Sequence, residues 1–100
     1  MNPWLSESRP NFWLSCATVE KGENITPEQI RLALEAENIE ARPIWKPMHL
    51  QPVFAANELI SIGDNVGEDI FARGLCLPSD IKMTEEQQER VIFIIRRLFT

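Results

Sequence analysis

Hydrophobic and polar positions change their period several times along the chain, and each change marks a predicted strand or helix. Residues 11–19 mix large apolar side chains with small polar ones and include β-branched and aromatic residues, which is typical of a strand packed on both faces. Residues 39–45 also look extended, but Pro43 cannot donate to a ladder, so this strand is expected at a sheet edge or with a break. Residues 75–78 form a short apolar run that ends in proline. The pattern therefore predicts three strands.

Three other segments are predicted to be amphipathic helices. Residues 26–29, Thr-Pro-Glu-Gln, form a capping box with proline at the first helical position, and this helix is expected to end near Asn38 in a left-handed conformation. A second capping box at residues 84–87 begins the C-terminal helix. Between them, residues 65–73 are predicted to form a helix that Gly74 stops as a left-handed glycine.

The element order β-α-β-loop-α-β-α predicts an α/β (α+β) fold in which helices cover a small three-stranded sheet. The last strand is expected between the first two, because the short run at 75–77 is then protected in the middle. Residues 1–10 have no hydrophobic period and are predicted to be an extended leader, so residues 11–100 form the single small domain. Four side chains are expected to be buried together: Trp13, Leu34, Leu77 and Ile95.

The composition is typical of one soluble globular domain and argues against several classes of protein. The chain has 100 residues, of which 44% are hydrophobic and 25% charged, with a net charge of −5. Its apolar runs are far shorter than the roughly 20 residues of a membrane helix, and its acidic balance offers no basic surface for nucleic acid. The first residues lack the pattern of a secretory signal, so Cys16 and Cys76 are predicted to be reduced thiols of a cytoplasmic protein.

The common catalytic and metal-binding patterns are weak in this sequence. The single histidine, His49, leaves a Cys–His dyad with Cys16 or Cys76 as the hypothesis of a small hydrolase, but a thiol in a buried strand is usually inert. One histidine and two distant cysteines lack the paired spacing of a zinc site, so no metal site is predicted. Three acidic residues gather at the start of the middle helix, where the helix dipole explains them: Asp64, Glu68 and Asp69.

The proline-rich loop after the second strand carries the clearest binding chemistry. It holds three prolines within ten residues and yet is rich in large side chains. Arg42 can form a bidentate contact with a carboxylate or phosphate, Trp45 can stack on a sugar or flat ring, and Lys46 is a point cation. His49 can donate or accept a hydrogen bond near neutral pH, and Met48 lies beside it. In the alternative, structural interpretation, Trp45 and Met48 pack on the sheet and Arg42 pairs with a nearby glutamate.

The same loop resembles part of a known family. The string RPIWKPMHLQPVF at residues 42–54 is similar to a segment of the DegT/DnrJ/StrS family of pyridoxal-phosphate-dependent sugar aminotransferases. Four more segments resemble that family's C-terminal domain: NFWLSCATVE, TPEQIRLALEAENIEARP, EDIFARGLCLPS and TEEQQERVIFIIRRLF. The resemblance implies the fold of the small C-terminal domain of fold-type I transferases.

The resemblance also implies how function is divided in a parent enzyme. A large N-terminal domain binds pyridoxal phosphate through a Schiff-base lysine, and the parent, expected to be a homodimer, moves an amino group from glutamate to a nucleotide-linked keto sugar. No lysine of this chain matches that motif, so the chain alone is expected to bind no cofactor and to be inactive, and no residue is assigned a catalytic role. Trp45, Lys46 and His49 are implied to border the nucleotide-sugar pocket, with Arg42 and Met48 as weaker candidates. We expect these side chains to be at least partly exposed, with His49 as an accessible imidazole.

A hypothesis from another class is a free-standing α/β binding or regulatory module without catalysis. The two hypotheses differ in what the gene encodes upstream. A continuous reading frame into a lysine-bearing domain favours the enzyme, whereas a ribosome start before Met1 favours the module.

Overall fold

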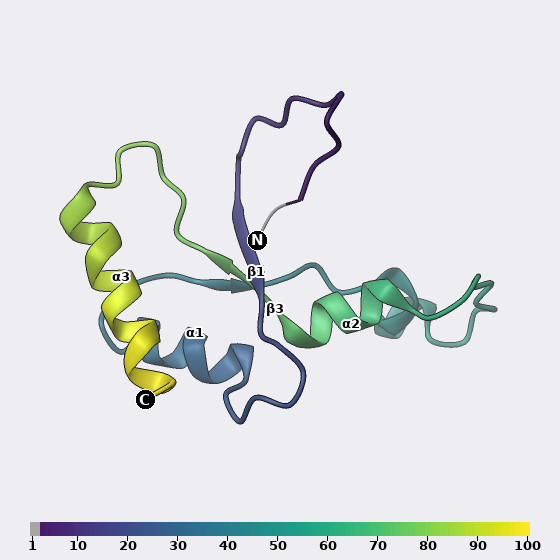
Figure 1. Cartoon of the computed structure of the whole chain (residues 1–100). Coiled ribbons are helices and arrows are strands. Elements are labelled where there is room, and N and C mark those ends of the chain that lie inside the picture. The colour runs from purple at the N-terminus through teal and green to yellow at the C-terminus, as the bar shows by residue number, and fades with distance from the viewer. Residues whose placement is uncertain (1–2) are drawn as a thin grey trace.

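In the computed structural model, which describes residues 3–100, a three-stranded antiparallel sheet packs against helices in a small α+β fold (Figure 1). The strands and α-helices follow one another as β1 (Ser15–Thr18), α1 (Pro27–Glu35), β2 (Arg42–Pro43), α2 (Val66–Arg73), β3 (Gly74–Leu77) and α3 (Glu85–Leu98). Two short 3₁₀ helices, η1 (Met48–Leu50) and η2 (Pro52–Phe54), lie between β2 and α2. Across the described residues, no helix is both long enough and apolar enough to cross a membrane.

The sheet is organised around β3, which pairs antiparallel with β1 on one side and with β2 on the other. Ser15 lies opposite Leu77, and Cys76 lies between Cys16 of β1 and Arg42 of β2. This is the strand order that the sequence predicts. The edge strand β2 spans two residues, because the proline at its end has no N–H for a longer ladder.

The first strand begins at Ser15 and not at Asn11, so its predicted start is wrong. The Asn11 side chain accepts a hydrogen bond from the backbone N–H of Trp13 at 3.1 Å, and Phe12 has a left-handed φ of 52°. Asparagine favours such local turns because its side chain can bond the backbone two residues further on. Because of this turn, strand pairing begins only at Ser15, and Trp13 is 70% exposed instead of buried.

The described part of the segment before this turn has no helix or strand and contains one local reversal of the chain. That it is a leader outside the domain stays a prediction. The N–H of Ser8 donates to the carbonyl of Leu5 at 3.0 Å, which closes a turn. The rings of Trp4 and Phe12 meet edge to face, with centroids 5.4 Å apart. An aromatic contact of this geometry stabilises the reversal of the chain. Residues 1 and 2 of the predicted leader lie outside the described residues.

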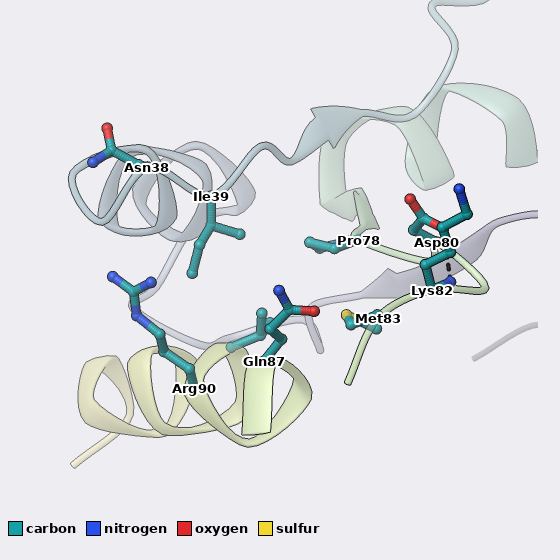
Figure 2. Close-up of a pocket in the computed structure, with 9 residues that line it drawn as sticks. Asn38, Ile39, Pro78, Asp80, Lys82, Met83, Gln87 and Arg90 are labelled. Atoms are coloured by element: carbon teal, nitrogen blue, oxygen red, sulfur yellow. Dashed lines mark hydrogen bonds between the residues drawn. The ribbon is translucent and has the colours of Figure 1, made fainter. Parts of the chain in front are cut away.

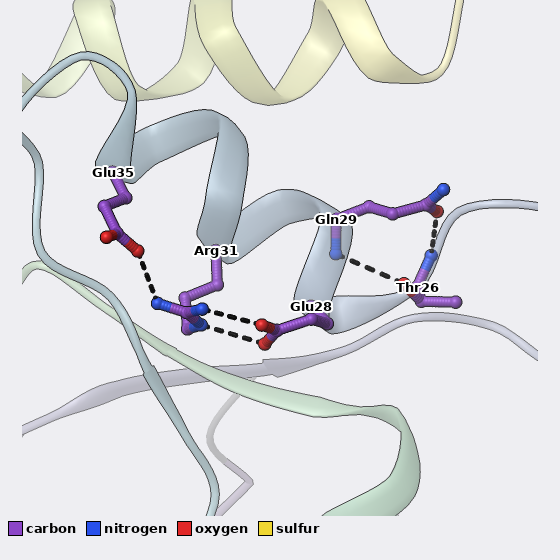
Figure 3. Close-up of polar contacts among 5 residues, drawn as sticks. All are labelled: Thr26, Glu28, Gln29, Arg31 and Glu35. Carbon is purple, nitrogen blue, oxygen red and sulfur yellow. Dashed lines mark hydrogen bonds and ion pairs between the residues drawn. The ribbon is translucent and has the colours of Figure 1, made fainter.

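Both predicted capping boxes are present. Thr26 Oγ1 accepts from the N–H of Gln29 at 3.2 Å, and Gln29 Oε1 accepts from the N–H of Thr26 at 2.8 Å (Figure 3). The same exchange joins Thr84 and Gln87 at the start of α3. Past the end of α1, Asn38 has the left-handed φ, 60°, that its residue type predicts. The two helices that build the core are therefore started by strictly local interactions.

Helix α1 is also stabilised along its solvent side by one arginine (Figure 3). Arg31 donates to Glu28 one turn before it, at 2.6 and 2.8 Å, and to Glu35 one turn after it, at 2.6 Å. The guanidinium holds the pKa of Glu28 below its usual value. Ion pairs three or four residues apart lie on the same face of a helix and favour the helical conformation.

The core lies between the sheet and the helices α1 and α3, which pack side by side (Figure 1). Its buried cluster consists of Ile30, Leu34, Ala41, Leu75 and Ile94. Of the four side chains expected to be buried together, Leu34 is fully buried, Leu77 and Ile95 are partly buried against the cluster, and Trp13 lies outside it. Helix α2 extends to the other side of the sheet and contributes no fully buried residue (Figure 1).

Gly74, at the junction of α2 and β3, is required by a close approach and not by a left-handed turn. Its φ of −97° and ψ of 157° are extended, so the predicted left-handed stop is wrong. A Cβ atom here would lie 2.3 Å from Cγ1 of Ile44 and 2.4 Å from the carbonyl oxygen of Ile70. Glycine therefore allows the first residue of β3 to lie directly against Ile44, the residue that follows β2.

We expect Leu34→Ala to lower the free energy of unfolding by about 2–5 kcal/mol, because it leaves a cavity in a closed part of the core. Leu32→Ala is the matched control, since Leu32 lies in the same helix and is 51% exposed. It should cost clearly less than 2 kcal/mol, about the range of surface changes. Urea denaturation followed by far-UV circular dichroism measures both, and equal losses would contradict the assignment of the core.

Gly74→Ala is expected to destabilise the fold by about 1–3 kcal/mol, because the new methyl group overlaps Ile44 and the backbone of Ile70. Gly67→Ala provides the contrast. Gly67 lies within α2, the nearest atom to an added Cβ is Cγ of Pro47 at 3.8 Å, and alanine favours a helix by about 0.5–1 kcal/mol. The same denaturation measurement should give opposite signs for the two variants, and a neutral Gly74→Ala would refute the close approach.

Candidate functional site

A hollow of about 450 Å³ lies at the end of the sheet where β1 begins and β3 ends. Its walls come from three segments of the chain: residues 13–14, residues 40–43 together with Trp45, and residues 76–79. Two of the predicted site residues, Arg42 and Trp45, line it. The fold therefore brings part of the proline-rich segment together with the start of β1, which is distant in sequence.

Two tryptophans form the aromatic wall of this hollow. The rings of Trp13 and Trp45 lie 6.4 Å apart at an interplanar angle of 50°. Trp13 is 70% exposed and Trp45 is 64% exposed, so both present ring surface to solvent and not to the core. The structural interpretation, in which Trp45 packs on the sheet, is therefore wrong. An exposed indole face can stack on a sugar or on another flat ring.

Arg42 supplies positive charge at the same hollow, and here the structural alternative is confirmed. Its Nη2 lies 2.6 Å from Oε1 of Glu40, and Nε also donates to this oxygen at 2.8 Å. Both side chains are more than two-thirds exposed. An exposed ion pair of this kind contributes about 0–1 kcal/mol, so an anionic ligand can compete for the guanidinium.

The proline-rich loop beyond Trp45 is held in shape by hydrogen bonds of its own. The N–H of Gln51 donates to the carbonyl of Met48 at 3.1 Å, and its side-chain amide donates to the carbonyl of Lys46 at 3.3 Å. The side chains of Lys46 and Met48 are exposed. The loop thus presents these two side chains outward, and Met48 does not pack on the sheet.

His49 is directed elsewhere, toward helix α2. Its Nε2 contacts Oε1 of Glu68, which lies in the first turn of that helix, and the imidazole side chain is only 22% exposed. The imidazole is therefore only partly exposed, because the Glu68 carboxylate covers part of the ring. This contact joins η1 to α2, and Pro47 lies beside the same helix at Gly67.

Asp69, the other acidic residue in the first turn of α2, is also paired. Asp69 accepts from Arg73 at 2.8 and 3.0 Å, and Lys21 lies 3.7 Å from it. Hydrogen bonding from Arg73 holds the pKa of Asp69 below its usual value. Arg73 also donates to the carbonyl of Val19 at 2.6 Å. Within residues 3–100 no group of three or more histidine, cysteine or acidic side chains is placed to hold a metal ion.

A second hollow, of about 410 Å³, lies between the end of α1, the loop after β3 and helix α3 (Figure 2). Several of its polar side chains already have partners in the chain. Arg90 donates to the carbonyl and the carboxylate of Glu37 at 3.0 Å. Asp80 accepts from the N–H of Lys82 at 2.8 Å (Figure 2). This hollow has no aromatic wall, so the hollow with the two tryptophans is the stronger candidate.

Sequence reasoning missed the roles of Trp13 in the hollow and of Glu68 beside His49. Trp13 was assigned to the core because it stood in an apolar run, and the turn signal of Asn11 was the sign that the strand begins later. Glu68 carried no signal beyond its place in the first turn of a helix. Its partner His49 stands nineteen residues away in the sequence.

The sequence is similar to proteins of known families. The family model of the DegT/DnrJ/EryC1/StrS aminotransferase family matches residues 2–96. The protein EpsN of Bacillus subtilis, named as a pyridoxal phosphate-dependent aminotransferase, is 47% identical over 91 residues, which are 89% of this chain and 23% of that protein. GDP-perosamine synthase of Caulobacter vibrioides is 35% identical over 83 residues, which are 81% of this chain and 21% of that protein.

The structure is similar to a solved one as well. The crystal structure of a DegT DnrJ EryC1 StrS aminotransferase from Brucella abortus matches with a TM-score of 0.67 and 26% sequence identity. The match covers 85% of this chain and 22% of the other chain. The chain thus spans less than a quarter of the length of the relatives it matches.

We expect His49 and Glu68 to be energetically coupled, because each gives the other a partner in a partly buried position. A double-mutant cycle with His49→Ala and Glu68→Gln should yield a coupling free energy of about 0.5–1 kcal/mol in urea denaturation. A second cycle pairs His49→Ala with Glu89→Gln, an exposed glutamate on α3, and should be additive. Additivity in both cycles would show that the contact does not hold η1 to α2.

Proposed function

Because the chain belongs to the DegT/DnrJ/EryC1/StrS aminotransferase family, we propose that it forms the C-terminal, substrate-bordering part of a pyridoxal-phosphate-dependent enzyme. The enzyme moves an amino group from glutamate to a keto sugar that is linked to a nucleotide. This chain contributes to binding and orienting the sugar nucleotide. The parent enzyme is proposed to be a cytoplasmic homodimer.

The observation that carries this proposal is the hollow with Trp13, Trp45 and Arg42 in its walls. A nucleotide sugar has flat or ring-shaped parts at both ends and a charged diphosphate between them. Exposed indole faces bind the rings by stacking, and a guanidinium binds phosphate oxygens in a bidentate way. The names of two relatives, an aminotransferase and GDP-perosamine synthase, support a substrate of this class.

The remaining predicted residues fit the proposal to different degrees. Lys46 and Met48 are exposed on the loop next to Trp45 and are proposed as further contacts to the substrate. His49 is covered by Glu68 in this chain, so its proposed role is indirect. By joining the loop to α2, it fixes the position from which Trp45 and Lys46 face a ligand. No residue of this chain is proposed to be catalytic.

The lysines described in this chain do not fit the site of the cofactor itself. A lysine that forms a Schiff base needs a desolvated pocket or a cationic neighbour that lowers its pKa. Lys21 is 77% exposed beside Asp69, and Lys46 and Lys82 are exposed in a loop and a turn. Pyridoxal phosphate, which supplies the electron sink for amino transfer when bound, is therefore proposed to be held by another part of the parent enzyme.

The free-standing binding module predicts a different result for the same hollow. Such a module would bind a nucleotide sugar without any other domain. Titration of this chain with a nucleotide sugar, followed by tryptophan fluorescence, separates the two functions. Saturable binding at micromolar concentration supports the module, and its absence supports a pocket that another domain completes.

In the full-length enzyme that carries this segment, Trp45→Ala should lower kcat/KM for the nucleotide sugar at least tenfold, which is about 1.4 kcal/mol of transition-state stabilisation. Trp13→Ala should lower it in the same direction, because both rings line one hollow. The half-reaction with glutamate should keep its rate, since glutamate carries no ring to stack. Steady-state and single-turnover kinetics measure the two effects separately.

Trp4→Ala is the matched control for that experiment. Trp4 is 58% exposed, but its ring packs against Phe12 and does not line the hollow. It should leave both kinetic constants within about twofold. A Trp45→Ala enzyme that uses the nucleotide sugar as well as the parent would refute the assignment of this hollow.

A further inference from the structure

Two cysteines face each other across the sheet on neighbouring strands. Cys16 of β1 is the direct partner of Cys76 of β3 in the antiparallel ladder, and their sulfur atoms lie 3.5 Å apart in a thiol–thiol contact. The residues are sixty positions apart in the sequence, so the fold alone brings them together. Neither is used by the proposed substrate contacts.

We propose that Cys16 and Cys76 form a redox pair, which a small-molecule disulfide converts into an intrachain disulfide that links β1 to β3. The ladder supplies the geometry for this bond. Directly opposed residues of an antiparallel pair have Cα atoms about 4.5–5.5 Å apart, and disulfides span Cα separations of about 4.4–6.8 Å. To form the bond, the two sulfur atoms therefore only have to move closer together, and the register of the two strands stays the same.

The reaction proceeds by thiol–disulfide exchange in two steps. Cys16 gives its proton to solvent, and its thiolate attacks one sulfur of the small disulfide and expels one small thiolate. The Cys76 sulfur, after losing its own proton, then attacks the Cys16 sulfur in the mixed disulfide and expels the second small thiolate. The two protons end on the two released thiols. Two electrons pass from the protein to the oxidant, so the exchange is balanced.

The surroundings of the two sulfurs determine which of them reacts first. Cys16 is the more exposed residue, whereas Cys76 is 8% exposed at the centre of the sheet. Burial and the contact with Cys16 raise the pKa of the Cys76 thiol to about 11, which disfavours its thiolate and its direct reaction with an external oxidant. Cys76 is therefore suited to the second, intramolecular step, in which proximity compensates for its low thiolate fraction.

The link also bears on the candidate site, because Cys76 lines the hollow with the two tryptophans. Its other ladder partner is Arg42, and Trp13 lies three residues before Cys16. A covalent bond between β1 and β3 would fix the distance between these two walls. In the reduced state the walls are joined by hydrogen bonds and a thiol contact.

The test measures how readily the pair closes in the folded chain. The protein is equilibrated with reduced and oxidised glutathione of defined ratio, quenched with acid, and analysed by intact mass for the loss of two hydrogen atoms. The effective concentration of one thiol toward the other should be at least about tenfold higher in native buffer than in guanidinium chloride, where a long flexible loop must close. The Cys76→Ser variant should form a mixed disulfide between Cys16 and glutathione, and no intrachain product. The Cys16→Ser variant should form no intrachain product and much less mixed disulfide in native buffer, because Cys76 is buried.

The matched control exchanges two neighbouring residues, Cys16→Ser together with Ser15→Cys. A shift of one position along a strand turns the thiol to the opposite face of the sheet, so this variant keeps its composition but should lose the advantage of the folded state. Circular dichroism confirms that it folds. Equal effective concentrations in native and denaturing buffer, or equal closure by the exchanged variant, would overturn the proposal.

Discussion

The position of β3 between two antiparallel partners is the constraint on which the rest of the structure depends. Its backbone must pair on both edges, its residue Leu75 must enter the core, and its first residue must pass directly under Ile44. Gly74 meets the last demand because any Cβ would overlap its neighbours. Since β1 and β2 make no ladder with each other, their backbones are joined in the sheet through this strand, which brings the start of β1 near the proline-rich segment.

The parts of the fold that the sequence predicted are those in which a few adjacent residues determine the structure. The capping boxes at Thr26 and Thr84 need only four residues each, and the left-handed Asn38 follows from its own side chain. Pro43 predicted an edge strand because a missing N–H has the same effect in any sheet. The start of β1 was missed, since the apolar residues before Ser15 resemble strand residues until the turn at Asn11 is seen.

The candidate site was predicted less completely, because its contacts join distant segments. Residue chemistry and the family resemblance made candidates of Arg42, Trp45, Lys46, Met48 and His49, but they could not show which of them share a surface. The structure groups Arg42 and Trp45 with Trp13 and directs His49 to Glu68. Both groupings depend on tertiary packing, which no local pattern of residues encodes. The residue type of Trp13, for example, does not show whether its side chain is exposed or buried.

Stability and binding chemistry are separated across the sheet by the alternation of side chains along β3. Leu75 packs with Leu34 and Ile94 in the core, whereas its neighbour Cys76 lines the hollow between the tryptophans. Changes at Leu34 are therefore expected to act on folding, whereas changes at Trp45, which is 64% exposed, are expected to have little effect on folding. The exception is Cys76 itself, which lies in the central strand and also touches the hollow. A covalent change at this one residue can therefore alter the rigidity of the strand and the shape of the site together.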